Sequence, residues 1–281
     1  MKILMIICLV ILIALPVLVL LYLLSVMPRM MNRPDITPFQ GWLYAHRGLH
    51  DNASDAPENS LRAFARAVEA GYGIELDVQL TKDQIPVVFH DFTLKRVCGV
   101  DKKVSELTLE ELEKLRICAS DQKIPTFARV LELVDGKVPL IVEYKIAALD
   151  TRVCELGDAL LSEYRGVYCI ESFNPLGVLW YKKHRGQVLR GILSDNYVKK
   201  GEKEFPVIFY QMLHNMIFNF IAKPDFIAYN SLFHRDWSRR ICRGLYRAPA
   251  VAWTIKSQEE LEKRRKDFDL FIFESFTPSA E

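Results

Sequence analysis

The sequence is poor in the residues that mark disordered, disulfide-stapled or nucleic-acid-binding proteins. Glycine and proline number only 13 each in 281 residues, which excludes a low-complexity or disordered chain. Of the six cysteines, Cys8 lies in the apolar N-terminal stretch; the other five are scattered without a metal-type pair and are expected to be reduced core thiols. The formal net charge is +2, which gives no support to a nucleic-acid partner. No feature of the sequence calls for an obligatory protein partner.

Charge is absent from residues 3–28, which are almost wholly Leu, Ile, Val and Met. About 20 such residues are enough to cross the hydrocarbon core of a bilayer as a helix. A cleaved signal peptide is the alternative, but its apolar region is usually about 7–15 residues long. Because no Ala-x-Ala-like cleavage site follows, the sequence favours a retained transmembrane anchor over residues 1–28.

The positions of the basic residues favour one side of the membrane for the rest of the chain. Lys2 precedes the apolar stretch, whereas Arg29 and Arg33 follow it. The positive-inside tendency, together with the reduced cysteines, therefore favours a single-pass protein of the cell membrane with its main domain in the cytoplasm.

Residues 29–39 are predicted to be a linker, and residues 40–281 a single domain in which strands and helices alternate. Strand-like runs occupy residues 42–46, 73–80, 138–144, 167–172, 188–193, 225–229, 250–255 and 268–273. Between them lie helical patterns, for example at residues 60–70, 108–115, 150–164, 176–184, 236–246 and 257–266. Alternation of this kind predicts an α/β protein, a closed (β/α)8 barrel of the TIM type, after the transmembrane helix.

Two finer features belong to the same prediction. An open doubly wound sheet is the alternative fold, but it would normally place a glycine-rich phosphate loop after the first strand, and residues 45–48 are not one. Residues 86–90 are expected to form a hairpin-like excursion after the second strand. Asn59 is predicted to cap the following helix, and residues 108–111 have the spacing of a capping box.

Three acidic residues fall where strand periodicity brings them together. Glu75 and Asp77 are two residues apart on one strand and therefore point to the same side, and Glu143 ends the next parallel strand. Adjacent buried carboxylates repel each other unless a cation bridges them or one is protonated. The trio predicts a hard oxygen site for one divalent cation, Mg²⁺ or Ca²⁺. Simple pairing of these acids with Arg and Lys is the alternative.

Two histidines and two cations accompany these acids. His46 and His90 each end a strand-like run, which is where barrel enzymes place catalytic groups. Such a pair can supply a general acid and a general base near neutral pH. Arg47 and Lys145 can hold a phosphodiester, whose transition state gathers negative charge on its oxygens.

The combined pattern resembles the signature of the glycerophosphodiester phosphodiesterase family. The motifs that carry the resemblance are His46-Arg47-Gly48, Pro57-Glu58-Asn59-Ser60, Glu75-Leu76-Asp77-Val78, Thr81-Lys82-Asp83, Val87-Val88-Phe89-His90-Asp91, Glu143-Tyr144-Lys145, Ser172-Phe173 and Trp253-Thr254. Each motif is weak alone, but together they run in order over residues 42–276.

The resemblance implies a metal-dependent hydrolase that converts glycerophosphodiesters to sn-glycerol 3-phosphate and an alcohol, in glycerophospholipid breakdown at the membrane. It also implies a role for each matching residue. The cation would be held by Glu75, Asp77 and Glu143, and the acid–base pair would be His46 and His90. Arg47 and Lys145 would bind the phosphate of the substrate, and Glu58 would bind the metal or a glycerol hydroxyl. Asn59 would support the loop after the first strand, and Trp253 would form a wall of the glycerol pocket.

One departure from the family pattern bears on substrate choice. Many relatives end the last strand with Asp or Asn before a proline, whereas this chain has Glu274 four residues before Pro278. A different pocket floor is therefore expected. A lysophospholipase D, acting on lysophospholipids in the bilayer, is the alternative enzyme. A catalytically silent membrane-tethered binding module is the alternative of another class, and it predicts a broken acid or histidine position, which the sequence does not have.

Two further segments bear on membrane lipids as a partner. Residues 205–222 are apolar apart from one narrow polar stripe, made by Gln211, His214, Asn215 and Asn219. This pattern is equally consistent with a segment that dips into the bilayer surface and with an ordinary buried helix. The helix at residues 236–246 carries an arginine stripe, which indicates a solvated basic face or, alternatively, contact with anionic headgroups.

Overall fold

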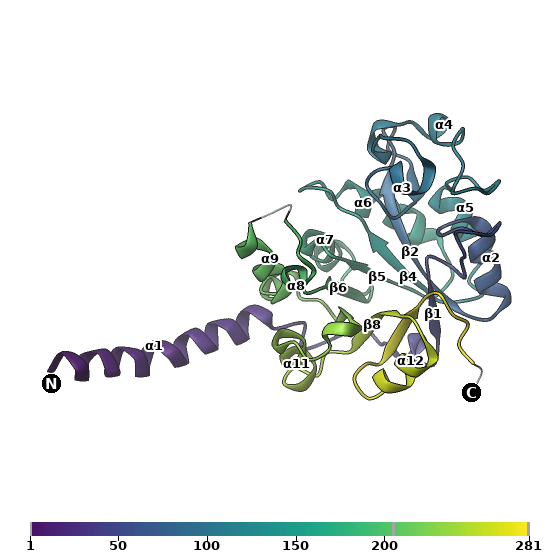
Figure 1. Ribbon diagram of the computed structural model, residues 1–281. Coiled ribbons are helices and arrows are strands. Elements are labelled where there is room, and N and C mark those ends of the chain that lie inside the picture. The colour runs from purple at the N-terminus through teal and green to yellow at the C-terminus, as the bar shows by residue number, and fades with distance from the viewer. Residues whose placement is uncertain (1, 204–205, 280–281) are drawn as a thin grey trace.

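The computed structural model describes residues 2–203 and 206–279, and its centre is a closed barrel of eight parallel strands (Figure 1). The barrel strands are β1 Leu43–His46, β2 Gly73–Leu80, β4 Leu140–Tyr144, β5 Tyr168–Ser172, β6 Arg190–Ser194, β7 Phe226–Asn230, β8 Ala250–Ile255 and β9 Leu270–Phe273. Each pairs with its neighbour in this order, and β1 pairs with both β9 and β2, which closes the ring. The predicted (β/α)8 barrel is confirmed, and the open-sheet alternative is excluded.

Helices cover the outside of the ring. They are α2 Leu61–Glu69, α5 Phe127–Val134, α6 Arg152–Glu163, α7 Pro175–His184, α8 Tyr197–Lys200, α9 Val207–His214, α10 Asn219–Ala222, α11 Trp237–Gly244 and α12 Gln258–Arg264. The first of these begins one residue later than predicted. Ser60, not Asn59, caps α2 by accepting a hydrogen bond from the amide of Ala63, and the side chain of Asn59 is used elsewhere.

The chain leaves the barrel after β2 and returns before α5. The short strand β3 Pro86–Val88 pairs antiparallel with β2, as the excursion at residues 86–90 predicts. Beyond it lie the helices α3 Lys95–Cys98, η2 Val104–Glu106 and α4 Leu109–Leu112, the last of which begins with the predicted capping box at Thr108. The excursion packs around its own apolar cluster, which includes Phe89 and Leu94. It therefore forms a stable flank beside the barrel (Figure 1).

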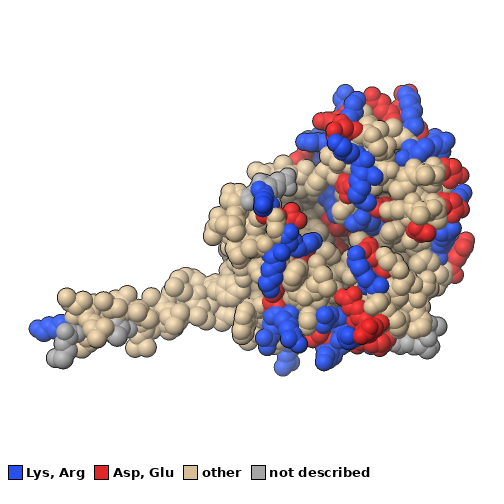
Figure 2. Space-filling view, in the orientation of Figure 1, with Lys and Arg blue, Asp and Glu red and all other residues tan. Residues whose placement is uncertain are grey.

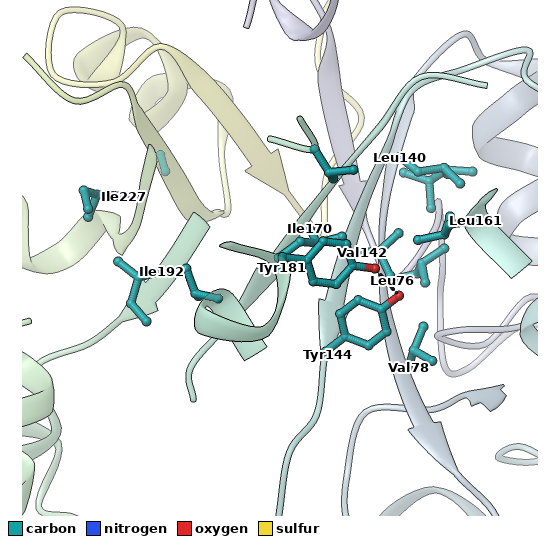
Figure 3. Packing of buried hydrophobic residues seen from close by; sticks show 14 of the residues in the cluster. Leu76, Val78, Leu140, Val142, Tyr144, Leu161, Ile170, Tyr181, Ile192 and Ile227 are labelled. Atoms are coloured by element: carbon teal, nitrogen blue, oxygen red, sulfur yellow. Dashed lines mark hydrogen bonds between the residues drawn. The ribbon is translucent and has the colours of Figure 1, made fainter. Parts of the chain in front are cut away.

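The core has two layers because successive strand residues face opposite sides of the ring. Ile74, Leu76 and Val78 point outward into the layer between strands and helices. Figure 3 shows this layer, in which the hydroxyls of Tyr144 and Tyr181 hydrogen-bond at 2.9 Å. The inside of the barrel holds a separate cluster that includes Tyr44 and Phe226. Because of this alternation, the even-numbered side chains of β2 pack against the helices, and the odd-numbered ones point into the barrel.

The helix α1 Lys2–Val26 extends away from the barrel (Figure 1) and is the one described helix long and apolar enough to cross a membrane. Length and composition admit a membrane span and a signal sequence equally. The segment predicted as a linker lies against the barrel. Arg29 donates to the carbonyl of Gly186 at 2.9 Å, and Phe39, at the end of η1 Thr37–Phe39, is buried in the inner cluster.

Candidate active site

Three acidic side chains meet inside the barrel, where the middle of β2 lies beside the carboxyl end of β4. Glu75, Asp77 and Glu143 are all buried, and each contributes one carboxylate oxygen to a group in which the oxygens lie within 4.8 Å of one another. The parallel register places Asp77 beside Glu143. The two strands therefore bring together the acids that strand periodicity predicted to converge.

The surroundings of Glu75 and Asp77 shift the pKa values of these two acids in opposite directions. Burial and the neighbouring carboxylates of Asp77 and Glu143 hold the pKa of Glu75 well above its usual value. Burial acts in the same direction on Asp77, but Lys145, His90 and Arg47 outweigh it and hold its pKa well below the usual value. Like charges this close cannot all ionise without a compensating cation. The three carboxylates therefore repel one another, and a bound divalent cation would relieve this repulsion.

Two cationic side chains lie against the acids. Lys145 contacts Glu143 at 2.6 Å and Asp77 at 3.0 Å, and it is itself nearly inaccessible to solvent. Arg47 follows β1 with a φ of 56°, and its guanidinium lies 3.5 Å from Asp77. Asn59 donates at 2.9 Å to Oδ2 of Asp77, the oxygen that Arg47 also faces, whereas Lys145 contacts Oδ1. Both predicted phosphate-binding cations thus lie at the acid group.

His46 ends β1 with its two ring nitrogens turned to different carboxylates. Nδ1 lies 2.6 Å from Glu274, whereas Nε2 lies 3.8 Å from Glu75. Burial and the charge of Arg47 lower the pKa of His46 to about 4, and Glu274 opposes that shift. The carboxylate of Glu274 also binds Lys256 at 2.9 Å. Glu274, which the sequence suggested as a determinant of the pocket floor, is therefore the residue that orients His46.

His90 has a similar arrangement on the other side of the site. Its Nδ1 lies 2.6 Å from Asp91, and Arg96 in turn binds Asp91 at 2.6 Å. Gln79 donates to the carbonyls of residues 89–91 and so fixes the backbone that carries this histidine. In both histidines a carboxylate engages Nδ1, which leaves Nε2 for chemistry.

Glu58 lies outside the group of three acids. Its two oxygens accept hydrogen bonds from Arg96, each at 2.8 Å, and further ones from Arg47 and Asn52. Burial would raise the pKa of Glu58, but Arg96 and Arg47 outweigh it and lower the pKa to about 2. In this arrangement Glu58 is an ionised support that links the β1 loop to the excursion.

Several residues of the site were missed by sequence reasoning. Glu171 on β5 is fully buried beside Glu143, and one of its oxygens has no hydrogen-bond partner within residues 2–203 and 206–279. Burial and Glu143 raise its pKa well above the usual value. Its position one residue before the end of a strand was the available signal. Gln79 repeats the two-residue spacing of Glu75 and Asp77, whereas Arg96 lies on the excursion and gave no signal.

One wall of the site is aromatic. Phe173 packs edge-on against Trp253, with ring centroids 5.4 Å apart, and the ammonium of Lys145 lies 5.8 Å from the Phe173 ring. The indole nitrogen of Trp253 is buried without a hydrogen-bond partner among the described residues. Tyr197 of α8 contacts Phe173 at 6.4 Å and stacks on Tyr210 of α9 at 5.4 Å. An aromatic path therefore leads from Lys145 to the helices after β6.

Comparison with known proteins places this geometry among phosphodiesterases. The family model for the glycerophosphoryl diester phosphodiesterase family matches residues 46–176. Glycerophosphodiester phosphodiesterase 1 of Mus musculus is 38% identical over 251 residues, which cover 77% of this chain and 72% of the mouse protein. A glycerophosphodiester phosphodiesterase of Caldanaerobacter subterraneus subsp. tengcongensis is 44% identical over 100 residues, 33% of this chain and 40% of that protein's length.

Solved structures agree on the fold. A phosphodiesterase from Oleispira antarctica, determined with its product sn-glycerol-3-phosphate, matches with a TM-score of 0.66 and 22% identity over 84% of this chain and 93% of the other. A glycerophosphodiester phosphodiesterase from Thermotoga maritima matches with a TM-score of 0.61 and 27% identity over 83% of this chain and 94% of the other. The same barrel therefore underlies all three proteins.

Proposed function

The chain belongs to the glycerophosphoryl diester phosphodiesterase family, and we propose that it hydrolyses glycerophosphodiesters to sn-glycerol 3-phosphate and an alcohol. The observation that carries this proposal is the convergence of the three acids, two histidines and two cations at one rim of the barrel. The names of the relatives point to the same reaction.

A divalent cation fits the acid group. The donors are three buried carboxylates whose oxygens lie within 4.8 Å, the hard ligands preferred by Mg²⁺ and Ca²⁺. We propose that Glu75, Asp77 and Glu143 hold one such ion. When bound, the ion would polarise the phosphate as a Lewis acid.

The histidines supply the proton transfers. With Nδ1 bound to a carboxylate, each ring offers Nε2 to the substrate. One histidine takes the proton of the nucleophile as that oxygen bonds to phosphorus. The nucleophile is either water, which gives glycerol 3-phosphate directly, or a hydroxyl of the glycerol, which gives a cyclic phosphate that water then opens. The other histidine gives a proton to the alkoxide as its bond to phosphorus breaks. Arg47 and Lys145 lie where the phosphate oxygens gain charge, and Trp253 forms a wall of the glycerol pocket.

The test uses the full-length protein in detergent with glycerophosphocholine as the substrate. We expect release of glycerol 3-phosphate that a chelator abolishes and that added Mg²⁺ or Ca²⁺ restores. His90→Ala is expected to reduce kcat at least about 10²-fold, the contribution of a positioned acid or base. His184→Ala, at an exposed histidine on α7, is the matched control. Turnover that survives both the chelator and His90→Ala would overturn the proposal and favour a silent binding module.

A lysophospholipase D is the second candidate function, and the aromatic path from Lys145 to Tyr210 favours it. In this reaction the headgroup alcohol leaves and the acyl chain stays on the glycerol phosphate, and that chain would lie along Phe173 and Tyr197, which lead away from the phosphate site. Assays of glycerophosphocholine against lysophosphatidylcholine separate the two functions. Activity confined to the soluble diester removes the lipid function.

The helix α1 is proposed to be a retained membrane anchor. Its last residue, Val26, is completely buried in the outer core layer of the barrel, and its carbonyl accepts a hydrogen bond from Asn219 at 3.0 Å. A cleaved leader would remove this residue from the folded domain. The contact therefore supports an anchor that remains part of the mature protein.

A further inference from the structure

The helix α9 is inverted relative to a solvent-facing barrel helix. Val207 and Ile208 are 63% and 66% exposed. His214 and Asn215 lie on the inner side, where His214 is 3.3 Å from the hydroxyl of Tyr229 and Asn215 accepts a hydrogen bond from Tyr22 of α1 at 3.2 Å. A helix covered by water shows the opposite distribution. Most of the polar stripe predicted within residues 205–222 thus faces the protein, whereas its first member, Gln211, is exposed (residue 205 itself lies outside the described residues).

The helix α11 is inverted in the same way. Trp237 and Leu245 are 72% and 58% exposed, whereas Arg239 is buried, donates to the carbonyl of His234 and lies 4.0 Å from the ring of Phe268. Arg243 pairs with Asp269. The arginine stripe that indicated a solvated basic face therefore packs partly against the barrel. Trp237 and Leu245 therefore face outward, whereas Ile241 between them packs against the core.

The short helix α10 continues the pattern between them. Asn219 is buried against the end of α1, while Phe220 and Ile221 are 50% and 42% exposed. We call six exposed apolar side chains in and directly after these three helices the collar. Its members are Val207, Ile208, Phe220, Ile221, Trp237 and Leu245.

The collar surrounds the base of α1, and that base is fixed to the barrel. The hydroxyl of Tyr246 donates to the carbonyl of Leu23 at 2.8 Å, and Lys223 donates to that of Met27 at 3.3 Å. Figure 1 shows α9 and α11 on either side of the point where α1 reaches the domain. Figure 2 shows the uncharged surface of α1 continuing onto this side of the domain. The anchor and the collar therefore form one surface.

We propose that the collar lies in the interfacial layer of the same bilayer that α1 crosses. The 25 residues of α1 span about 37 Å at 1.5 Å per residue, against about 30 Å of hydrocarbon, so its last turn ends at the interface. Because that turn is bonded to α10 and α11, the collar lies at the same depth. The guanidinium of Arg240, 5.1 Å from the Trp237 ring, is placed to reach lipid phosphates. This proposal rests on the retention of α1 and is independent of the chemistry.

Reconstitution with a photoreactive lipid tests the contact. The full-length protein is placed in vesicles of phosphatidylcholine and phosphatidylglycerol that contain a lipid with a diazirine near the headgroup, and adducts are located by mass spectrometry. We expect adducts on peptides spanning residues 206–222 and 237–247 as well as on α1. Peptides from the excursion, residues 99–123, should stay unlabelled because they lie on the side away from α1 (Figure 1).

Matched variants sharpen the test. Ile208→Asp is expected to reduce labelling of residues 206–222 about tenfold, which corresponds to about 1.4 kcal/mol of partitioning. Val167→Asp, at an exposed position just before β5 and outside the collar, should leave it unchanged. Trp237→Gln tests the same surface from α11. Unchanged turnover of glycerophosphocholine verifies the fold of each variant and keeps this test separate from that of the proposed function.

Two outcomes would overturn the proposal. Adducts confined to α1 in the wild-type protein would place the collar in water. Cross-links between collar residues of two chains, with a dimer in sedimentation, would identify a second copy of the chain as the occupant instead of lipid.

Discussion

A carboxylate on Nδ1 is the common feature of the two histidines, and at His46 that carboxylate is Glu274. The 2.6 Å contact fixes the ring so that Nε2 faces the acid group, and Lys256 holds the other oxygen of Glu274 at 2.9 Å. Glu274 does not touch the acids itself. It is therefore a positioning residue, which acts through His46.

Glu274→Gln is expected to lower kcat/KM about 10²-fold, because an amide neither fixes the tautomer nor stabilises the protonated ring as a carboxylate does. Measurement of kcat/KM and of the melting temperature checks this. Glu262→Gln, at an exposed glutamate of α12, is the control and should change neither. A loss of melting temperature in Glu274→Gln that matched the loss of activity would indicate a merely structural role.

Glu58 makes stability depend on pH in the acid range. Its pKa in the folded protein is about 2, below its ordinary value of 4.5, so the ionised form favours folding. The resulting stability is fully present above about pH 4.5 and is lost as the pH falls through 2. Its size at neutral pH is on the order of 3 kcal/mol. We expect Glu58→Gln to be less stable than wild type in urea unfolding at pH 6, by a margin that shrinks at pH 3. A margin equal at both pH values would contradict this origin.

The residues of the site differ in how well a sequence can identify them. Glu75 and Asp77 could be predicted because strand periodicity puts them on one side of the same strand, and Glu143 because it lies near the end of the next parallel strand. Arg96 could not, because it lies on an excursion whose path back to Glu58 is set by tertiary packing. Glu171 lies on a predicted strand, yet only the register of β5 against β4 reveals its place beside Glu143.

At the scale of elements, strands were predicted better than helix faces. The buried apolar runs at 73–80 and 250–255 match β2 and β8 residue for residue. The helices α9 and α11 were located by their periodicity, but periodicity cannot tell which side of a helix faces inward. The usual assumption that apolar side chains point to the core holds for Ile241 and fails for Trp237 and Leu245.

Two glycines in different surroundings are expected to respond to alanine with stability changes of opposite sign. A Cβ on Gly191 of β6 would lie 2.0 Å from the ring of Phe226, whereas one on Gly244 of α11 would meet nothing within 4 Å. Gly191→Ala is expected to destabilise the barrel by about 1–3 kcal/mol through overpacking. Gly244→Ala should stabilise the helix by roughly 0.5–1 kcal/mol. Urea unfolding of both variants checks the pair, and a loss of stability in Gly244→Ala would refute the account.

At the scale of the whole molecule, the two ends of the domain differ in surface character. Charged side chains gather around the excursion and also over α11, whereas the surface that runs from α1 onto α9 is largely uncharged (Figure 2). The site lies between them, with Arg96 reaching it from the charged flank and Tyr197 connecting it to α9. This polarity suits a domain held on one side by a membrane and open to water on the other.

A domain held on one side by a membrane requires that α1 is retained in the mature protein. Val26 is part of the outer core layer, and its carbonyl is bonded by Asn219. A chain cleaved before the barrel would leave that buried amide unpaired, at a cost of about 1–3 kcal/mol. We therefore expect the protein extracted from native membranes to resist alkaline carbonate and to have an intact mass that includes α1. Val26→Asp should lower the melting temperature of the barrel itself, whereas Val10→Asp, on the exposed part of α1, should impair insertion without lowering it. A soluble mature form that begins after residue 26 and keeps the wild-type melting temperature would show that the helix is a leader rather than an anchor.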